Sequence, residues 1–166
     1  MQTCPQCGAI TPPSDIDAHP YFGASGGCWA IYGDILEREY SNPEFFANHR
    51  QTVDAYALQH PGNKEDLRAI QSVNIHLIAL TILYKTHIQA PKIAPIMGKI
   101  INANKNSFAW LEPPESFGPY DVMTIWPLTE RDAHLAGVDR WARNVWEAWE
   151  IHHDIAWEYI KAEGIS

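Results

Sequence analysis

Residues 19–61, HPYFGASGGCWAIYGDILEREYSNPEFFANHRQTVDAYALQHP, decide the fold of this chain. The stretch contains one cysteine, three histidines and two apolar runs with helical spacing. Upstream of it, Cys4-Pro5-Gln6-Cys7-Gly8 has the spacing of a zinc knuckle, in which two thiolates approach one ion from a tight turn. We therefore expect these two pieces of chain to close a single metal site, with the helices arranged around it.

The quoted stretch predicts two helices. Apolar side chains recur at helical spacing over residues 28–40 and again up to about residue 59. Asn42 and Pro43 separate the two runs, with Asn42 placed as a cap and Pro43 at the first position of the second helix. His60-Pro61-Gly62 then ends the second helix.

The rest of the chain predicts further helices and one long loop. Helical periodicity extends over residues 65–87, more weakly over 92–104, and again near the end, where we expect one continuous helix from about 138 to 162. Prolines and glycines between the helix over 92–104 and this C-terminal helix predict a long ordered loop. The predicted fold is an all-α bundle of about five helices in a single domain, 1–166: a zinc-pinned N-terminal segment (1–27), helices one to four (28–105), a long Pro-rich loop (106–128) and a C-terminal Trp-rich helix (129–163).

Composition limits the classes of function. The 166 residues are 46% hydrophobic and 19% charged, which is typical of a globular chain that can bury a core. The net charge is -8 and no cluster of Lys or Arg stands out, so no nucleic-acid partner is expected. We find no secretory signal and no uninterrupted apolar run of membrane-spanning length, so no membrane partner is expected either. Three cysteines, two of them in Cys-x-x-Cys, fit a reducing cytoplasm and a metal better than disulfides.

The cysteines supply three of the four tetrahedral ligands that a structural zinc ion takes. Cys4 and Cys7 form the knuckle, and Gly8 allows the backbone geometry behind the second sulfur. Cys28 is the only other cysteine, so it is the natural third ligand. The fourth must be a histidine or a carboxylate. Three histidines compete for that position: His19, His49 and His60.

Helix geometry distinguishes two of these histidines. His49 and His60 lie on one predicted helix, and eleven residues at about 1.5 Å each separate them by about 16 Å, so they cannot bind the same ion. If the two helices form an antiparallel hairpin that turns near Asn42, Cys28 lies about 21 Å from the turn and His60 at a comparable height. His49 lies only about 10 Å from the turn. His60 is therefore favoured, while His19, in a loop shortly before Cys28, stays possible.

The remaining histidines offer a second place for chemistry. His76 lies on the apolar face of the third predicted helix. His152 and His153 point about 100° apart on a helix, so only one can share a given pocket, and His153 could line an aromatic cavity with the neighbouring tryptophans. Convergence of His19, His76 and His153 would make a three-histidine metal site with an open position. Two aspartates on the first helices are expected at exposed surfaces, as carboxylates usually are: Asp34 and Asp54.

Several motifs together give the chain a family resemblance. They are the Cys-Pro-x-Cys-Gly knuckle, Gly27-Cys28-Trp29-Ala30, Gln59-His60-Pro61-Gly62 and the pattern from Trp141 to His153. In these motifs the chain resembles an uncharacterised bacterial family, domain of unknown function 5946, and the resemblance covers nearly its whole length. The resemblance implies a metal role for four residues and supplies no substrate: Cys4, Cys7, Cys28 and His60.

Three functions are consistent with these features. The first is a non-catalytic, zinc-stabilised helical protein, because a closed Cys3His set leaves no coordination position for a substrate. The second is a metal-dependent enzyme with a second, histidine-lined site between helices. The third is a thiol-based redox sensor in which Cys4 and Cys7 release zinc on oxidation. We rank the hypotheses in this order, with zinc as the expected cofactor.

Overall fold

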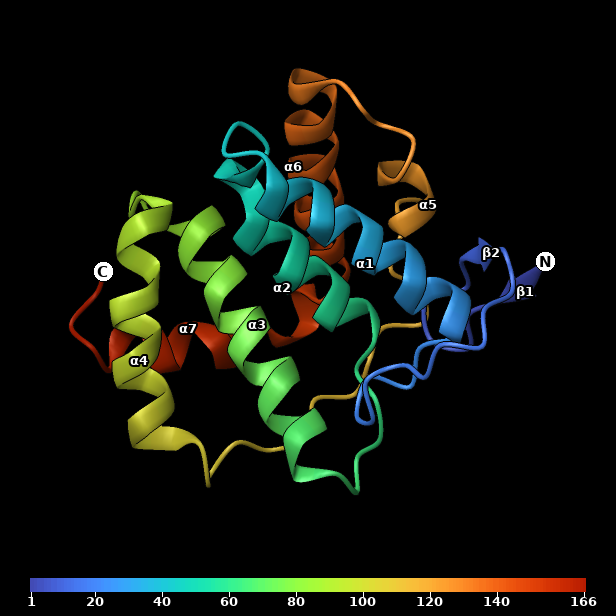
Figure 1. The fold of residues 1–166 in the computed structure, drawn as a ribbon. Coiled ribbons are helices and arrows are strands. Elements are labelled where there is room, and N and C mark those ends of the chain that lie inside the picture. Colours follow the sequence, from blue (N-terminus) through green and yellow to red (C-terminus); the bar gives the residue numbers. More distant parts are fainter.

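The computed structural model describes all 166 residues, and most of them lie in helices (Figure 1). A short antiparallel hairpin precedes seven α-helices, so the predicted all-α class is confirmed, with more helices than expected. The elements are β1 (Gln2–Thr3), β2 (Ile10–Thr11), α1 (Gly26–Ser41), α2 (His49–Gln59), α3 (Leu67–Lys85), α4 (Ile93–Asn104), α5 (Val122–Ile125), α6 (Arg131–Ala148) and α7 (His153–Lys161). Three 3-10 segments precede α2, α4 and α7: Phe46–Asn48, Ala90–Lys92 and Glu150–His152.

Side-chain caps set the start of three helices. Ser25 accepts a hydrogen bond from the backbone N–H of Cys28 in the first turn of α1, and Asp66 caps α3 in the same way. Asp121 caps the short α5 through a capping box that Thr124 completes. Each cap satisfies backbone N–H groups that the first turn of a helix leaves without an internal partner.

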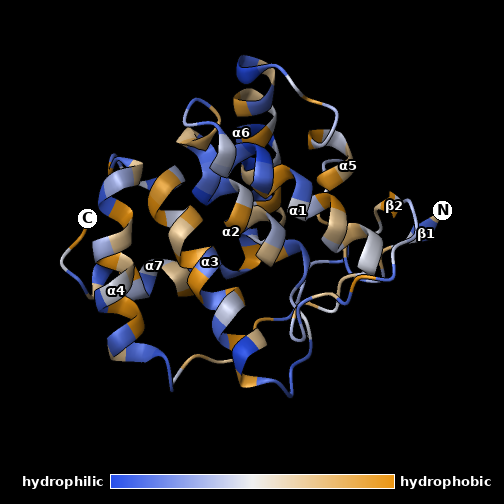
Figure 2. Ribbon diagram, viewed as in Figure 1, coloured by the Kyte–Doolittle hydropathy of each residue, from blue (hydrophilic) through white to orange (hydrophobic).

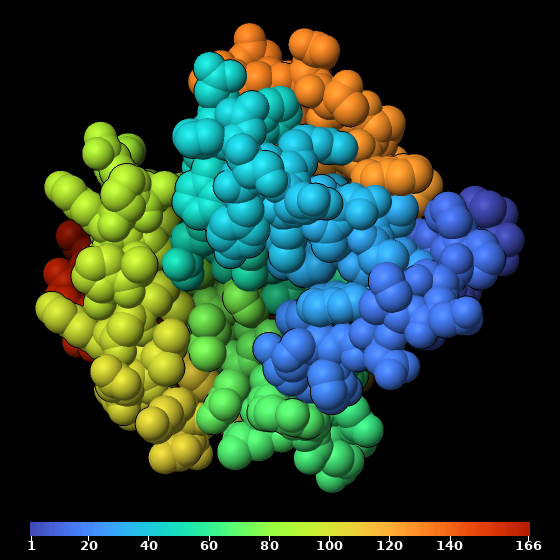
Figure 3. Space-filling model, viewed as in Figure 1, coloured from blue at the N-terminus to red at the C-terminus, as the bar shows by residue number.

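Helices α2 and α3 form the centre of the bundle. α2 packs against α3 and α6, and α3 also packs against α4, α6 and α7. One hydrophobic core of 32 residues joins these elements and includes the fully buried indoles of Trp141 and Trp149. Figure 2 shows apolar and polar residues alternating along α3 and α4, as in helices with one buried side. In Figure 3 the N-terminal segment covers the end of α1 that lies away from α4.

The second helix begins later than predicted. The residues after Pro43 form a turn and a 3-10 segment, and α2 starts only at His49. The buried ring of Phe45 packs edge-on against the ring of His134, with 5.2 Å between centroids. This contact with α6 lies outside the local sequence, and it holds the segment in a turn where cap and proline signals favoured a helix.

The prediction of one continuous C-terminal helix is wrong, because the chain turns at Trp149. α6 ends at Ala148, and α7 runs in a new direction behind α3 and α4 (Figure 1). The indole N–H of Trp149 donates to the carbonyl oxygen of Leu58, 3.2 Å away. Nε2 of His153 lies 2.7 Å from the carbonyl oxygen of Trp146, an acceptor in the last turn of α6. The apolar period of the sequence therefore continues across residues where the backbone helix is broken, and tertiary contacts stabilise that break.

The predicted long loop is irregular except for α5. Its first part, residues 110–118, faces the Cys-Pro-x-Cys-Gly knuckle across a surface cleft of about 650 Å³. The loop thus lies against the N-terminal segment, although about 100 residues separate them in sequence.

By length and composition alone, α3 is long and apolar enough to cross a membrane, although polar residues interrupt its apolar sequence. In the fold, 56% of that window is buried inside the protein and the helix packs against four others. α3 is therefore a core helix of the bundle.

Candidate metal centre

Three separate segments meet at one end of α1. Cys4 and Cys7 come from the turn between β1 and β2, Cys28 from the first turn of α1, and His60 from the residue that ends α2. The three sulfurs and one imidazole nitrogen of these residues all lie within 4.8 Å of one another. The side chains of three are almost fully buried, and Cys7 is half-buried. The structure therefore brings together the four residues that the sequence singled out.

Three of the distances between donor atoms match the edges of a tetrahedron around a small cation. The Sγ atoms of Cys7 and Cys28 are 3.8 Å apart. Nε2 of His60 lies 3.5 Å from Sγ of Cys4 and 3.4 Å from Sγ of Cys28. Zinc bonds of about 2.3 Å to sulfur and about 2.0–2.1 Å to nitrogen give tetrahedral edges of about 3.8 Å and about 3.5 Å. These three spacings fit zinc coordination, and the remaining pairs of donor atoms lie within 4.8 Å of each other.

The His60 ring is oriented by its own helix. Nδ1 lies 2.7 Å from the backbone carbonyl oxygen of Tyr56, which can only accept, so Nδ1 carries the proton. Nε2 then has a lone pair that faces the sulfurs, as in metal-binding histidines whose second nitrogen donates to a carbonyl. The rings of Tyr56 and His60 also stack, with centroids 4.0 Å apart. The last turn of α2 thus fixes both the tautomer and the direction of the ligand.

Tyr56 also contacts a sulfur directly. Its hydroxyl donates to Sγ of Cys28 at 3.7 Å, and the phenol ring stacks on Tyr32 with centroids 3.7 Å apart. Burial, followed by the negative charge of Cys28, raises the pKa of Tyr56, so the hydroxyl stays protonated and remains a donor. Such an O–H to thiolate bond stabilises the charged form of the ligand.

The three neighbouring thiols shift one another's pKa values, so that ionisation of one disfavours ionisation of the others. Hydrogen bonds from Cys28 and Cys7 hold the pKa of Cys4 far below its ordinary value, whereas the proximity of Cys4 and Cys7 raises the pKa of Cys28. By themselves the sulfurs accommodate one negative charge easily and resist further ones, because like charges crowd together. A divalent cation would remove this conflict, since it binds all three as thiolates.

Glycines allow the N-terminal segment to reach the cluster. Gly8 has φ +79° in the knuckle turn, a conformation that L side chains rarely adopt. A Cβ atom on Gly27 would collide with the carbonyl oxygen of Pro12 and the hydroxyl of Thr11, and one on Gly26 would also collide with backbone carbonyl oxygens. The backbone before α1 can therefore lie directly on the helix start, which carries Cys28 into the cluster.

The Gln59-His60-Pro61-Gly62 motif connects the cluster to the bundle. The buried amide of Gln59 accepts from the indole N–H of Trp141 at 3.0 Å and donates to the carbonyl oxygen of Tyr120 at 2.7 Å. Gly62 has φ +75°, and a Cβ there would collide with the carbonyl oxygen of Tyr21. The motif therefore combines one candidate ligand with the contacts that hold its neighbours in place.

The other histidines do not converge. His19 packs edge-on against Tyr21, 4.3 Å between centroids, and its Nδ1 is buried without a hydrogen-bond partner. His153 stacks on Trp146 and bonds its carbonyl, and the Nε2 of His152 bonds a loop carbonyl. Only the Cys3His set forms a group of three or more candidate metal ligands. The three-histidine site considered from the sequence is therefore wrong.

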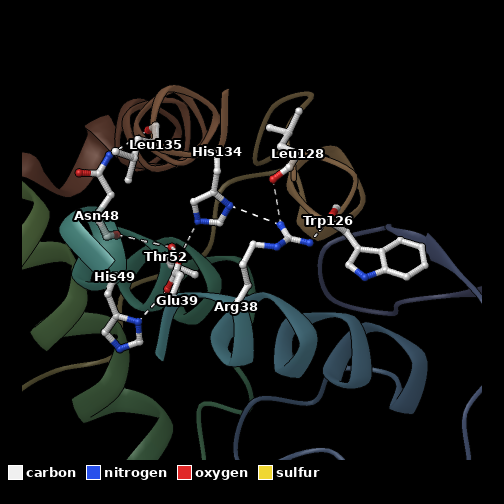
Figure 4. A network of polar contacts seen from close by, with 9 residues as sticks. All are labelled: Arg38, Glu39, Asn48, His49, Thr52, Trp126, Leu128, His134 and Leu135. Carbon is white, nitrogen blue, oxygen red and sulfur yellow. Dashed lines mark hydrogen bonds and ion pairs between the residues drawn. The ribbon is translucent and has the colours of Figure 1, made fainter. Parts of the chain in front are cut away.

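Two buried carboxylates were missed by sequence reasoning. Asp54, expected at an exposed surface, is 2% exposed and bonds Nδ1 of His76 at 2.7 Å. Glu39 is 0% exposed and lies at the centre of a polar network between α1, α2 and α6 (Figure 4). A signal existed for Glu39, because it follows Ile35 by four residues and so continues the apolar stripe of α1.

The fold and the cluster together define a class of protein. It is an α-helical bundle whose N-terminal knuckle and first helix hairpin form a Cys3His group close enough to hold a metal ion. The chain belongs to the family of unknown function DUF5946, whose model matches residues 2–150. The resemblance inferred from the motifs is thereby confirmed. No curated protein and no solved structure matches the chain.

Proposed function

We propose that the protein binds one zinc ion through Cys4, Cys7, Cys28 and His60, and that the ion has a structural role. The observation that carries this proposal is the close approach of four donor atoms from three segments, all within 4.8 Å of one another. Three thiolates and one imidazole favour zinc, because soft sulfur donors in tetrahedral geometry suit it better than the hard cations magnesium or calcium.

The structural role follows from what the ion would join. Of the first 25 residues, only Cys4, Ala9, Thr11, Phe22 and Ser25 are buried, so this segment has little apolar contact of its own with the bundle. A four-ligand site would attach it to the start of α1, through Cys28, and to the end of α2, through His60. Closed sites of this kind stabilise folds and leave no coordination position for a substrate.

The two alternatives have less support. A redox sensor requires a solvent-accessible thiolate, whereas Cys4 and Cys28 are almost fully buried and Cys7 is half-buried. A metal-dependent enzyme would need a second metal site, and no second group of three candidate ligands is present. The reduced thiols and the acidic net charge are consistent with a cytoplasmic protein without a nucleic-acid or membrane partner, and we include this in the proposal.

The test combines metal analysis with amide hydrogen exchange. Purified wild-type protein should contain one zinc ion per chain, and removal of zinc by a strong chelator should increase exchange in residues 1–25 and around Pro61 far more than in α3. The His60→Asn variant should lose the zinc. His87→Asn is the matched control, because His87 is exposed and makes no hydrogen bond.

Two results would overturn the proposal. Wild-type protein that carries no zinc after purification in zinc-containing medium would refute metal binding. A zinc-free protein whose N-terminal exchange equals that of the zinc form would refute the structural role. Mild peroxide that expels the zinc without unfolding would instead favour the redox sensor.

A further inference from the structure

A second cleft lies between α2, α3 and α4, away from the Cys3His cluster. Its volume is about 460 Å³, which is within the range of small-molecule sites. The cleft is on the face shown in Figure 3, between the surface of α4 and the surfaces of α2 and α3. Its walls are mostly apolar, and polar side chains enter only from α2 and α3. The apolar lining consists of Val53, Ile75, Ala94, Met97 and Ile101.

Two histidines line this cleft, and each is anchored by a buried carboxylate. Nδ1 of His76 lies 2.7 Å from Oδ1 of Asp54, and Nδ1 of His49 lies 2.7 Å from Oε2 of Glu39. The two carboxylates are 3% and 0% exposed at their side chains. An ionised carboxylate only accepts hydrogen bonds, so in both histidines Nδ1 donates. The same arrangement thus occurs twice at one cleft.

The other nitrogen of each ring has no partner within the protein. Neither Nε2 of His49 nor Nε2 of His76 makes a hydrogen bond, and the two side chains are 14% and 18% exposed. The carboxylates hold the ring proton on Nδ1, so in the neutral form of each imidazole the lone pair is on Nε2. The cleft therefore offers two hydrogen-bond acceptors on an apolar lining.

The acceptors are held rigidly from behind. Glu39 also accepts from the hydroxyl of Thr52 at 2.5 Å and from Nε2 of His134 at 3.0 Å. Arg38 in turn donates to Nδ1 of His134 at 3.4 Å, and its guanidinium bonds two carbonyl oxygens of the segment before α6. Figure 4 shows this chain from Arg38 through His134 and Glu39 to His49. The position of the His49 ring is thus fixed by a network that spans three helices.

The second histidine is held by a shorter set of contacts. Asp54 accepts a hydrogen bond from Nδ1 of His76 on one oxygen, and Nε of Arg50 lies 3.4 Å from the other as an ion pair without a hydrogen bond. The charge of Arg50, at the edge of the cleft, is therefore balanced by Asp54. An anionic ligand would meet two nitrogen lone pairs and, behind them, two buried carboxylates, so the cleft does not favour an anion.

We propose that this cleft binds a small, mostly apolar molecule with a hydroxyl group, such as a phenol, whose O–H donates to Nε2 of His76 or His49. The apolar side chains of the cleft contact the ring of the ligand, and Nε2 of an anchored imidazole accepts the hydrogen bond from its hydroxyl group. A metal ion does not fit, because no third protein ligand joins the two histidines. This inference goes beyond the structural zinc site and does not depend on it.

The test compares 4-methylphenol with toluene, which differ only in the hydroxyl group. In zinc-loaded wild-type protein with labelled histidines, 4-methylphenol should shift the Nε2 resonances of His49 or His76 and leave His87 unchanged. Loss of one such hydrogen bond is worth about tenfold in affinity, so toluene should bind about tenfold more weakly by calorimetry. His76→Phe should reduce this preference for the phenol.

A blocking variant makes the test independent of the histidines. Gly98 lines the cleft from α4, and a Cβ there meets no atom within 4 Å, so Gly98→Leu can fold and fill the cleft. Gly33→Leu is the control, because Gly33 lies in α1 with equally open space and does not line the cleft. Gly98→Leu should abolish binding of 4-methylphenol, and Gly33→Leu should not change it.

The proposal is overturned if 4-methylphenol and toluene bind equally, or if neither binds up to the solubility limit. It is also overturned if 4-methylphenol shifts other histidines instead, or if Gly98→Leu binds it as tightly as wild type.

Discussion

Replacement of Glu39 by glutamine tests whether the fold depends on a buried negative charge. Glu39 accepts three hydrogen bonds, from Thr52, His134 and His49, and all three donors are buried or nearly so. The side chain of glutamine has the same shape, and its oxygen can keep the bonds from Thr52 and His134. Its amide group faces Nδ1 of His49, where a donor would meet a donor.

The expected loss of stability follows from these three bonds. A hydrogen bond to a charged group contributes about 1.5–3 kcal/mol and a neutral one about 1 kcal/mol. Glu39→Gln loses the bond to His49 and weakens the other two, while it removes the cost of burying a charge. We therefore expect the free energy of unfolding to fall by about 2–3 kcal/mol at pH 7.

The pH dependence checks the same reasoning. Burial raises the pKa of Glu39, but the hydrogen bonds from His134, His49 and Thr52 outweigh it and leave the pKa below its ordinary value. A carboxylate whose pKa is lowered in the folded state stabilises the fold above the unfolded pKa, about 4.3 for glutamate. That contribution is lost as pH falls through the lower, folded pKa. The difference between wild type and Glu39→Gln should therefore shrink on acidification below about pH 4.

The assay is urea denaturation followed by circular dichroism, at pH 7 and then at decreasing pH for as long as the fold persists. If the free energy of unfolding falls with urea concentration at the same slope in wild type and variant, the substitution has changed only stability. Glu37→Gln is the control, because Glu37 is exposed on the same helix and makes no ion pair, and it should change stability by less than about 0.5 kcal/mol. If Glu39→Gln is as stable as this control at pH 7, the negative charge of Glu39 does not stabilise the fold through its three hydrogen bonds.

Three further substitutions test the metal centre and its supports. Tyr56→Phe removes the hydroxyl that donates to the sulfur of Cys28, so zinc affinity, measured by competition with a chromophoric chelator, should fall about tenfold. Gln59→Leu leaves the indole N–H of Trp141 and a carbonyl oxygen without partners, so urea denaturation should show a loss of about 2–4 kcal/mol. Gly62→Ala forces a Cβ into a carbonyl oxygen at positive φ, so thermal unfolding should show a loss above about 2 kcal/mol.

Each of these changes has a control in the same chain. Tyr32→Phe removes a hydroxyl that makes no hydrogen bond within the protein, and zinc affinity should not change. Gln71→Leu loses only an exposed bond to the carbonyl oxygen of Lys105, and should cost less than about 1 kcal/mol. Gly164→Ala has φ +78° but no atom near the added Cβ, so it isolates the backbone cost, about 1 kcal/mol. If a substitution changes zinc affinity or stability no more than its control does, the contact assigned to the replaced residue does not contribute as proposed.

Sequence reasoning recovered the parts of this protein that local physics fixes. A helix has a constant rise per residue, so the spacing of His49 and His60 alone showed that both could not approach Cys28. The structure places His60 with Cys28 at one end of the α1–α2 hairpin and His49 with Glu39 at the other. The helical periods of α3 and α4 were also recognised to within a few residues, because apolar stripes report which side of a helix is buried.

Only the tertiary structure decided where long-range contacts override these patterns. The apolar period after Val138 is unbroken, yet the chain turns at Trp149, where its indole bonds a carbonyl of α2. Glu39 and His134 are 95 residues apart, and no local pattern pairs a carboxylate on α1 with an imidazole on α6. Periodicity reports burial along one element, whereas partner choice depends on how several elements pack. For that reason the sequence predicted the Cys3His cluster, and the paired histidines of the second cleft emerged only from the fold.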